Sequence, residues 1–242
     1  MERKSAQGPA AALFDVDGTL ADTSYLNTVT WWEAFSQAGH DVPMALIHRA
    51  IGMGSEQMLD KLLPDDRDKD ADADIRTAHS ALYAAYWSRL RPLPGAADLL
   101  RVCKKRGLAV VLASSADERE FTMLRTVLDA EDAIDAATFS GDVDTSKPAP
   151  DLVEAALGKI GIPAAEAVFV GDTVWDVQAC QEGLGPVHRG AQRRLQPRRT
   201  HLGGRRGGLP RPGRAASRLA GKPARPRQDP RIEQSALRRP DQ

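Results

Sequence analysis

Residues 13–20 read LFDVDGTL, and this stretch decides the fold. The apolar residues 11–14 have the length and composition of a buried parallel strand. Gly18 then permits a sharp turn where a side chain would obstruct the backbone. The stretch therefore predicts a strand that delivers Asp15 and Asp17 to the carboxyl end of a parallel sheet, where ligands bind in open α/β folds.

The two aspartates predict a metal-assisted reaction at phosphorus. Neighbouring carboxylates repel each other unless a cation joins them. Mg²⁺ suits this position because it takes oxygen ligands and bridges protein carboxylates to substrate phosphates. One carboxylate can attack phosphorus while the other transfers protons. Taken alone, the motif is also compatible with a polar turn or a calcium-binding loop.

Beyond residue 92 the chain alternates helical and strand-like stretches, which predicts a mostly parallel, Rossmann-like α/β sheet. The expected strands are 108–113, 137–139 and 167–170, and the expected helices are 96–106, 117–129 and 151–160. Polar residues follow the strands or lie in loops that return to the same edge: Ser114, Ser115, Lys147, Asp172 and Asp176. Together with Asp15 and Asp17, they form the inventory of a site for a phosphate dianion and a divalent metal.

Residues 25–91 predict a small all-helical insert, with helices before Gly39 and at 43–50, 55–63 and 72–90. In the first helix, the expected buried stripe is Leu26, Val29, Trp32, Phe35 and Ala38. One of the adjacent Trp31 and Trp32 is expected to pack inward. Three histidines, His40, His48 and His79, belong to no motif, so packing or surface roles are expected for them.

Four segments in order carry a family resemblance: LFDVDGTL, VVLASS, SKPAPD and VFVGDTVWD. In these motifs the chain resembles the haloacid dehalogenase superfamily, in its phosphatase and phosphomutase branch, over residues 10–182. The helical insert after the first motif resembles that family's helical cap. The implied domains are an α/β core (1–24 and 92–182), a helical cap (25–91) and a tail (183–242).

The resemblance implies a role for each motif residue. Asp15 would be the nucleophile that forms an aspartyl-phosphate, and Asp17 the general acid and then base. Lys147 would stabilise charge on nucleophile and phosphate, and Ser114 would bind a phosphate oxygen, with Ser115 as a further candidate. Metal ligation would involve the Asp15 carboxylate, the Asp17 backbone carbonyl and Asp172, and Asp176 would orient the metal site or Lys147.

The expected activity is Mg²⁺-dependent hydrolysis of a small phosphate monoester, resembling phosphoglycolate or a sugar phosphate. A beta-phosphoglucomutase-like phosphomutase is the nearest alternative, since the motifs do not reveal whether water or a sugar hydroxyl accepts the phosphoryl group. An inactive remnant or a binding protein with a basic arm is the alternative from another class. The expected partner is a small phosphorylated metabolite, not a membrane or, beyond nonspecific contact, nucleic acid.

The net charge of zero hides two dissimilar parts. Residues 1–182 hold 17 Lys+Arg against 30 Asp+Glu, whereas residues 183–242 hold 16 against 3. The tail has no Phe, Trp or Tyr but 8 of the 16 prolines, so it is expected to be poorly ordered. Two cysteines indicate no disulfide framework, and no signal peptide or membrane span is recognised, so a cytoplasmic enzyme is expected.

The tail also departs from the family pattern, because residues 183–218 show neither strand alternation nor a helical apolar stripe. Its Arg, Gly, Pro and Ala have GC-rich codons, which suggests the hypothesis of a frameshift near residues 181–187 that removes the last strand and helix of the core. The other interpretation is a genuine basic arm that binds polyanions nonspecifically.

Overall fold

The computed structural model describes residues 9–183, and these form an α/β fold around one parallel sheet. The predicted fold class is thereby confirmed, whereas the interpretations of the tail concern residues outside this range. The strand order is β3-β2-β1-β4. The strands are β1 (Ala11–Phe14), β2 (Ala109–Ala113), β3 (Ala136–Thr138) and β4 (Ala167–Val170).

The first strand lies between two parallel neighbours, which explains its continuous apolar sequence. Leu13 is paired with Val111 of β2 on one side and with Phe169 of β4 on the other. Side chains alternate between the two faces of the sheet. One buried cluster contains Ala12, Phe14, Val110 and Leu112, and another contains Ala11, Leu13, Val111 and Ala113.

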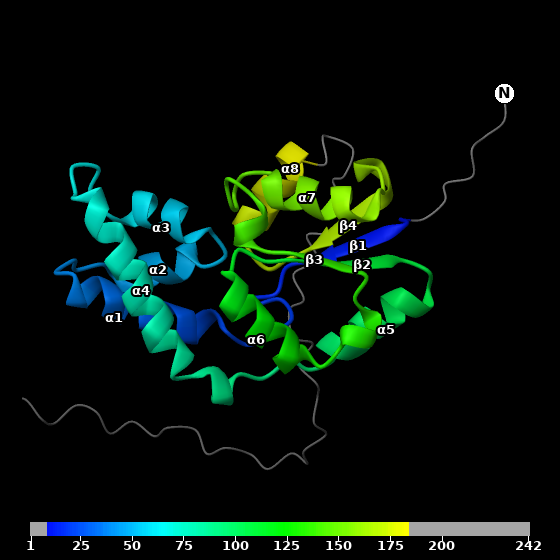
Figure 1. Cartoon of the computed structure of the whole chain (residues 1–242), viewed down its shortest axis with the longest axis horizontal. Coiled ribbons are helices and arrows are strands. Elements are labelled where there is room, and N and C mark those ends of the chain that lie inside the picture. Colours follow the sequence, from blue (N-terminus) through cyan, green and yellow to red (C-terminus); the bar gives the residue numbers. More distant parts are fainter. Residues whose placement is uncertain (1–8, 184–242) are drawn as a thin grey trace, which may run out of the picture. The chain divides into compact units, whose positions relative to one another are not determined.

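Each face of the sheet is covered by helices, as Figure 1 shows. On one face lie α5 (Ala96–Lys105) and α6 (Glu118–Leu128), which contribute Leu100, Phe121 and Leu124 to the first cluster. On the other lie α7 (Asp151–Ile160) and α8 (Val174–Gly183), with Val153, Ala156 and Ala179 in the second. Burial of both faces stabilises a parallel sheet.

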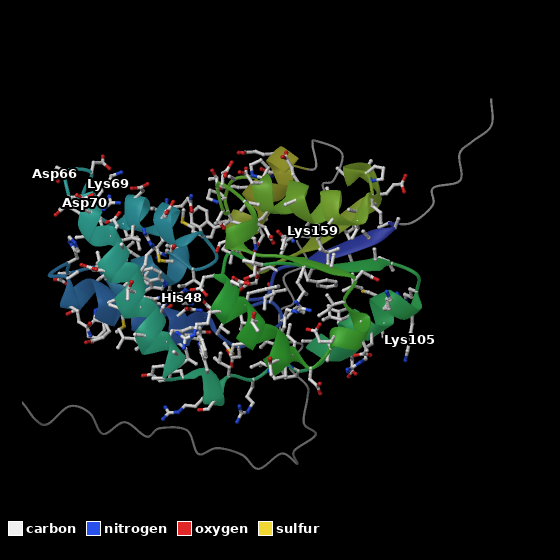
Figure 2. The ribbon with its side chains drawn as sticks, in the orientation of Figure 1. His48, Asp66, Lys69, Asp70, Lys105 and Lys159 are labelled. Atoms are coloured by element: carbon white, nitrogen blue, oxygen red, sulfur yellow. The ribbon has the colours of Figure 1, made fainter. Side chains whose placement is uncertain are left out.

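Polar contacts at the surface support this arrangement. Lys159 of α7, labelled in Figure 2, donates from Nζ to the carbonyl of Ala137 in β3 and to Asp142 Oδ2, both at 2.7 Å. The Lys159 ammonium therefore connects α7 to β3, an outer strand of the sheet. Because the Lys159 side chain is 39% exposed, its ion pair contributes little to stability.

Residues Ser24–Arg89, called the helical insert below, form their own apolar cluster around Phe35, Ile47 and Leu59. The insert is coloured blue to cyan in Figure 1. Its helices are α1 (Ser24–Gln37), α2 (Met44–Ala50), α3 (Ser55–Leu62) and α4 (Asp72–Ala84), with short 3₁₀ turns at Lys69–Ala71 and Trp87–Arg89.

The predicted buried stripe of α1 was wrong in most of its positions. Val29 and Trp32 are 41% and 37% exposed, whereas Trp31 is the inward tryptophan at 5%. The buried face instead carries polar residues, including Asn27 and Thr30. Burial here follows the contact of α1 with α4 and with the polar site described below, rather than apolarity alone.

The helix predicted at 72–90 ends earlier, at Ala84. A turn and the 3₁₀ helix Trp87–Arg89 follow, and the chain is extended from Leu90. Arg91 then accepts a hydrogen bond from the amide of Asp22, and Leu93 donates one to the carbonyl of Leu20. Pro92 also disfavours a helical conformation at the residue before it. Return to the sheet therefore sets the end of α4.

Candidate active site

The functional side chains gather at the carboxyl edge of the sheet because the parallel strands all end there. Asp15 and Asp17 follow β1, Ser114 and Ser115 follow β2, and Asp172 follows β4. Lys147 comes from the loop before α7, and Asp176 lies in the first turn of α8. All seven residues singled out from the sequence lie at this edge.

Lys147 lies between two carboxylates in the interior. Its Nζ is 2.6 Å from Asp15 Oδ1 and 2.9 Å from Asp176 Oδ1, and all three side chains are at most 3% exposed. Burial alone would lower the pKa of Lys147, but the charges of Asp15 and Asp176 outweigh it and raise that pKa. The site therefore keeps a permanent ammonium beside the first aspartate.

The acidity of Asp15 reflects its surroundings. Burial raises the pKa of Asp15 well above its usual value, the Lys147 charge opposes this, and the charges of Asp176 and Asp17 add to it. Its Oδ2 is buried and has no hydrogen-bond partner among residues 9–183. Such an oxygen is costly unless a ligand contacts it.

The residues present fit a divalent metal ion. Carboxylate oxygens of Asp15, Asp172 and Asp176 lie within 4.8 Å of one another. Carboxylate oxygens are the donors that a hard cation such as Mg²⁺ takes, and Asp15 Oδ2 is buried without a hydrogen-bond partner among residues 9–183. Gly18 has φ +77°, and a Cβ there would lie 2.6 Å from Asp172 Oδ2, so glycine allows the loop to reach this carboxylate.

Asp17 is held by neutral donors rather than by a salt bridge. Its Oδ1 accepts from Asn27 Nδ2 at 3.4 Å, and its Oδ2 accepts from the Ser114 hydroxyl at 3.5 Å. The residue is 9% exposed, and this burial raises the pKa of Asp17. A carboxyl group with a raised pKa suits proton donation and return.

The two serines after β2 have different surroundings. Ser114 is fully buried, and its oxygen also accepts from the amide of Ala116 at 3.1 Å. Ser115 donates to the carbonyl of Gly52 at 3.3 Å and accepts from the Ser146 hydroxyl at 2.9 Å. Ser115 thus contacts the helical insert, whereas Ser114 faces Asp17.

The loop between α2 and α3 of the insert packs tightly on the sheet edge. The amide of Gly54 donates to the carbonyl of Lys147 at 3.0 Å, and Trp175 Nε1 donates to the carbonyl of Arg49 at 3.0 Å. A Cβ on Gly54 would lie 2.6 Å from the Cβ of Ser146. Absence of a side chain at Gly54 is therefore required for this approach.

A cavity of about 450 Å³ opens between the insert and the sheet edge. Asp15 and Asp17 line it, together with apolar side chains of the insert such as Met53 and Met58. Its volume suits a small metabolite, and two buried carboxylates lie in its wall.

Sequence reasoning missed three residues near Asp17: Asn27, His79 and Glu120. All three line the cavity. Burial, followed by the charge of Asp17, raises the pKa of Glu120 well above its usual value. A signal existed only for Asn27, which precedes Trp31 by one helical turn and so shares its inward face.

Comparisons with known proteins agree with this geometry. The model of the haloacid dehalogenase-like hydrolase family matches residues 9–183. Protein SUPPRESSOR OF QUENCHING 1, chloroplastic, of Arabidopsis thaliana is 30% identical over 179 residues, which are 71% of this chain. The match spans only 17% of that plant protein.

Two further relatives are matched over most of their length. Phosphoglycolate phosphatase of Neisseria gonorrhoeae is 25% identical, with 71% of this chain and 75% of the relative covered. The crystal structure of a hydrolase from Pseudomonas syringae shares 32% identity and a TM-score of 0.68, with 72% and 80% of the two chains covered.

None of the helices in the described part of the chain combines the length and apolar composition that a membrane crossing requires.

The family match covers the whole described part of the chain, including every candidate residue at the sheet edge. The chain therefore belongs to the haloacid dehalogenase-like hydrolase family and is a hydrolase of its phosphatase type.

Proposed function

We propose that this protein hydrolyses a small phosphate monoester through an aspartyl-phosphate on Asp15, with Mg²⁺ as cofactor. The observation that carries the proposal is the surroundings of Asp15. One carboxylate oxygen is 2.6 Å from the Lys147 ammonium, and the other has no partner among residues 9–183. Asp15 lines a cavity of about 450 Å³, which is large enough for a metabolite.

In the first step, the Asp15 carboxylate forms a bond to phosphorus while the ester P–O bond breaks. Asp17 donates its proton to the leaving oxygen, so that the product departs as an alcohol. Lys147 counters the negative charge that develops on the nucleophile and the phosphoryl oxygens. Ser114, adjacent to Asp17, is proposed to donate a hydrogen bond to a phosphoryl oxygen, with Ser115 as a further candidate donor.

In the second step, water attacks phosphorus and Asp17 takes the proton that the water releases. The bond between phosphorus and Asp15 breaks, which regenerates the carboxylate and releases inorganic phosphate. The helical insert covers the cavity and excludes bulk water during this sequence. Hydrolysis rather than transfer requires that a single water reaches the position of the departed alcohol.

Asp15, Asp172 and the backbone carbonyl of Asp17 would hold the metal ion, and Asp176 would orient Lys147 beside it. Bound Mg²⁺ would neutralise charge between the carboxylates and the phosphate oxygens. Phosphoglycolate and sugar phosphates are the proposed substrates, the former being the substrate in the name of the Neisseria relative.

Thermal unfolding with Mg²⁺ and fluoroberyllate, which mimics an aspartyl-phosphate, tests whether the site assembles. We expect Mg²⁺ with fluoroberyllate to raise the unfolding midpoint of the wild type and to leave the midpoint of Asp15→Asn unchanged. The reason is that fluoroberyllate binds only to the Asp15 carboxylate of the native protein. Phosphate release from a panel of alkyl phosphates then tests turnover. A wild type that releases phosphate from no member of the panel would overturn the proposed function, whether or not the midpoint shifts.

A further inference from the structure

We propose that Asn27 and His79 of the helical insert are positioning residues that orient Asp17 for proton transfer to the leaving group. The inference rests on the proposed function, because it assigns a task within that reaction. Neither residue belongs to the four motifs, and both are 6% exposed. Asn27 contacts Asp17 from α1, and His79 contacts Asn27 from α4, so neither comes from the sheet.

The direction of each hydrogen bond follows from chemistry. Asp17 as a carboxylate only accepts, so Asn27 must turn its amide NH₂ toward Asp17 Oδ1, at 3.4 Å. The amide oxygen of Asn27 then faces His79 Nε2, at 3.2 Å. Because that oxygen only accepts, the proton of neutral His79 must lie on Nε2. The result is a directed chain from His79 through Asn27 to Asp17.

The far end of this chain is rigid. The His79 ring is stacked on Trp31 with centroids 4.0 Å apart and an interplanar angle of 12°. The Tyr83 ring is also nearly parallel to His79, with centroids 5.8 Å apart and an interplanar angle of 9°. Burial also lowers the pKa of His79 to about 3, so the ring stays neutral at working pH. A fixed, neutral imidazole holds one orientation of the Asn27 amide.

This arrangement distinguishes the two oxygens of Asp17. The amide of Asn27 engages Oδ1, which leaves Oδ2 as the oxygen that carries the proton and faces Ser114 at 3.5 Å. Loss of Asn27 would let the carboxyl group rotate about its last bond. Proton donation would then suffer, while the reactivity of Asp15 would stay intact because Lys147 sets it.

The test compares two esters that differ in their need for an acid. An alkoxide leaving group needs a proton from Asp17, whereas p-nitrophenolate leaves as a stable anion. For each variant, kcat/KM is measured with the alkyl phosphate that the wild type hydrolyses fastest and with p-nitrophenyl phosphate. This parameter reports the steps up to formation of the aspartyl-phosphate, where Asp17 acts as acid.

For Asn27→Leu we expect kcat/KM for the alkyl ester to fall at least about tenfold, which is part of the effect of a general acid. The kcat/KM for p-nitrophenyl phosphate should change less than about threefold. His79→Leu should give the same selective pattern. His79→Gln, whose amide NH₂ can replace Nε2, should restore most of the lost activity. Rescue of this kind is not expected of a residue that only fills space.

Thr30→Val is the matched control. Thr30 lies on the same helix, is 2% exposed, and bonds within α1 to the carbonyls of Leu26 and Asn27. Thr30→Val should leave the ratio of kcat/KM for the alkyl ester to kcat/KM for p-nitrophenyl phosphate unchanged. Thermal midpoints of all variants identify any that fail to fold. If the leucine variants fail, the two esters are compared in His79→Gln and the wild type.

Equal losses on both esters, or no loss on either, would overturn the positioning role while leaving the proposed function in place. A wild type that hydrolyses no alkyl phosphate of the panel would instead overturn the proposed function, and the inference with it. The two failures are therefore distinguishable in one set of measurements.

Discussion

The ammonium of Lys147 lies 2.6 Å from the carboxylate of Asp15, although 132 positions separate the two residues in the chain. Both are buried, and Asp176 approaches the same ammonium from a third segment at 2.9 Å. The site is therefore a buried cation between two carboxylates that three separate segments of the chain bring together. Removal of the ammonium leaves two buried carboxylates without a counterion.

Lys147→Met should destabilise the metal-free protein by about 3–5 kcal/mol, because two buried carboxylates lose their counterion. Urea denaturation at neutral pH measures this. The loss should shrink as the pH falls, since burial already raises the pKa of Asp15 and protonation removes its charge.

Lys159→Met is the control, because its ion pair with Asp142 lies at the surface and should contribute about 1 kcal/mol or less. Equal losses for the two variants would contradict the assigned role of Lys147.

Asp17→Asn should change the pH dependence of turnover. Burial raises the pKa of Asp17, so its protonated form persists above the usual carboxyl range. Activity on an alkyl ester needs that proton, so kcat/KM should fall as pH rises through this pKa. Asp17→Asn should lose most of its activity, and its remaining kcat/KM should no longer fall as the pH rises through this range. A pH profile that Asp17→Asn leaves unchanged would exclude this residue as the acid.

Mg²⁺ should stabilise the folded protein, and more strongly as the pH rises. Protons compete with the metal for Asp15, whose pKa is raised, so binding strengthens when that carboxyl ionises. At 100 times the dissociation constant the gain is about 2.7 kcal/mol. Thermal or urea unfolding with and without Mg²⁺ measures it. Asp172→Asn should abolish the gain, and an undiminished gain in that variant would place the metal elsewhere.

Gly54→Ala should lower activity by disturbing the docking of the helical insert, with little effect on the stability of the core. The added Cβ would lie 2.6 Å from the Cβ of Ser146 and displace the loop whose amide binds the Lys147 carbonyl. Because a misplacement of roughly 1 Å can cost about 100-fold in rate, we expect kcat/KM to fall at least about tenfold. Urea denaturation should show only a small change in core stability.

Gly158→Ala in α7 is the matched control for Gly54→Ala. A Cβ there meets nothing within 4 Å, and alanine should stabilise the helix by about 0.5–1 kcal/mol without affecting activity. If Gly54→Ala is as active as Gly158→Ala, the tight approach of the loop has no catalytic importance.

Much of the core followed from local patterns. The runs ending at Phe14, Ala113 and Val170 are apolar because both faces of a parallel sheet are buried, and polar residues follow each run at the carboxyl edge of the sheet. These signals depend on neighbours in the chain. The sequence alone therefore determined the sheet, the edge at which the candidate residues gather, and the family.

Only the tertiary structure decided what surrounds those residues. Asn27 and His79 lie 52 positions apart, on helices whose rotation depends on packing, and the apolar pattern of α1 pointed to another face. The use of Ser115 as a contact to Gly52 likewise depends on how the insert docks. Contacts between distant segments are set by the sum of many packing interactions, and no local pattern carries that information.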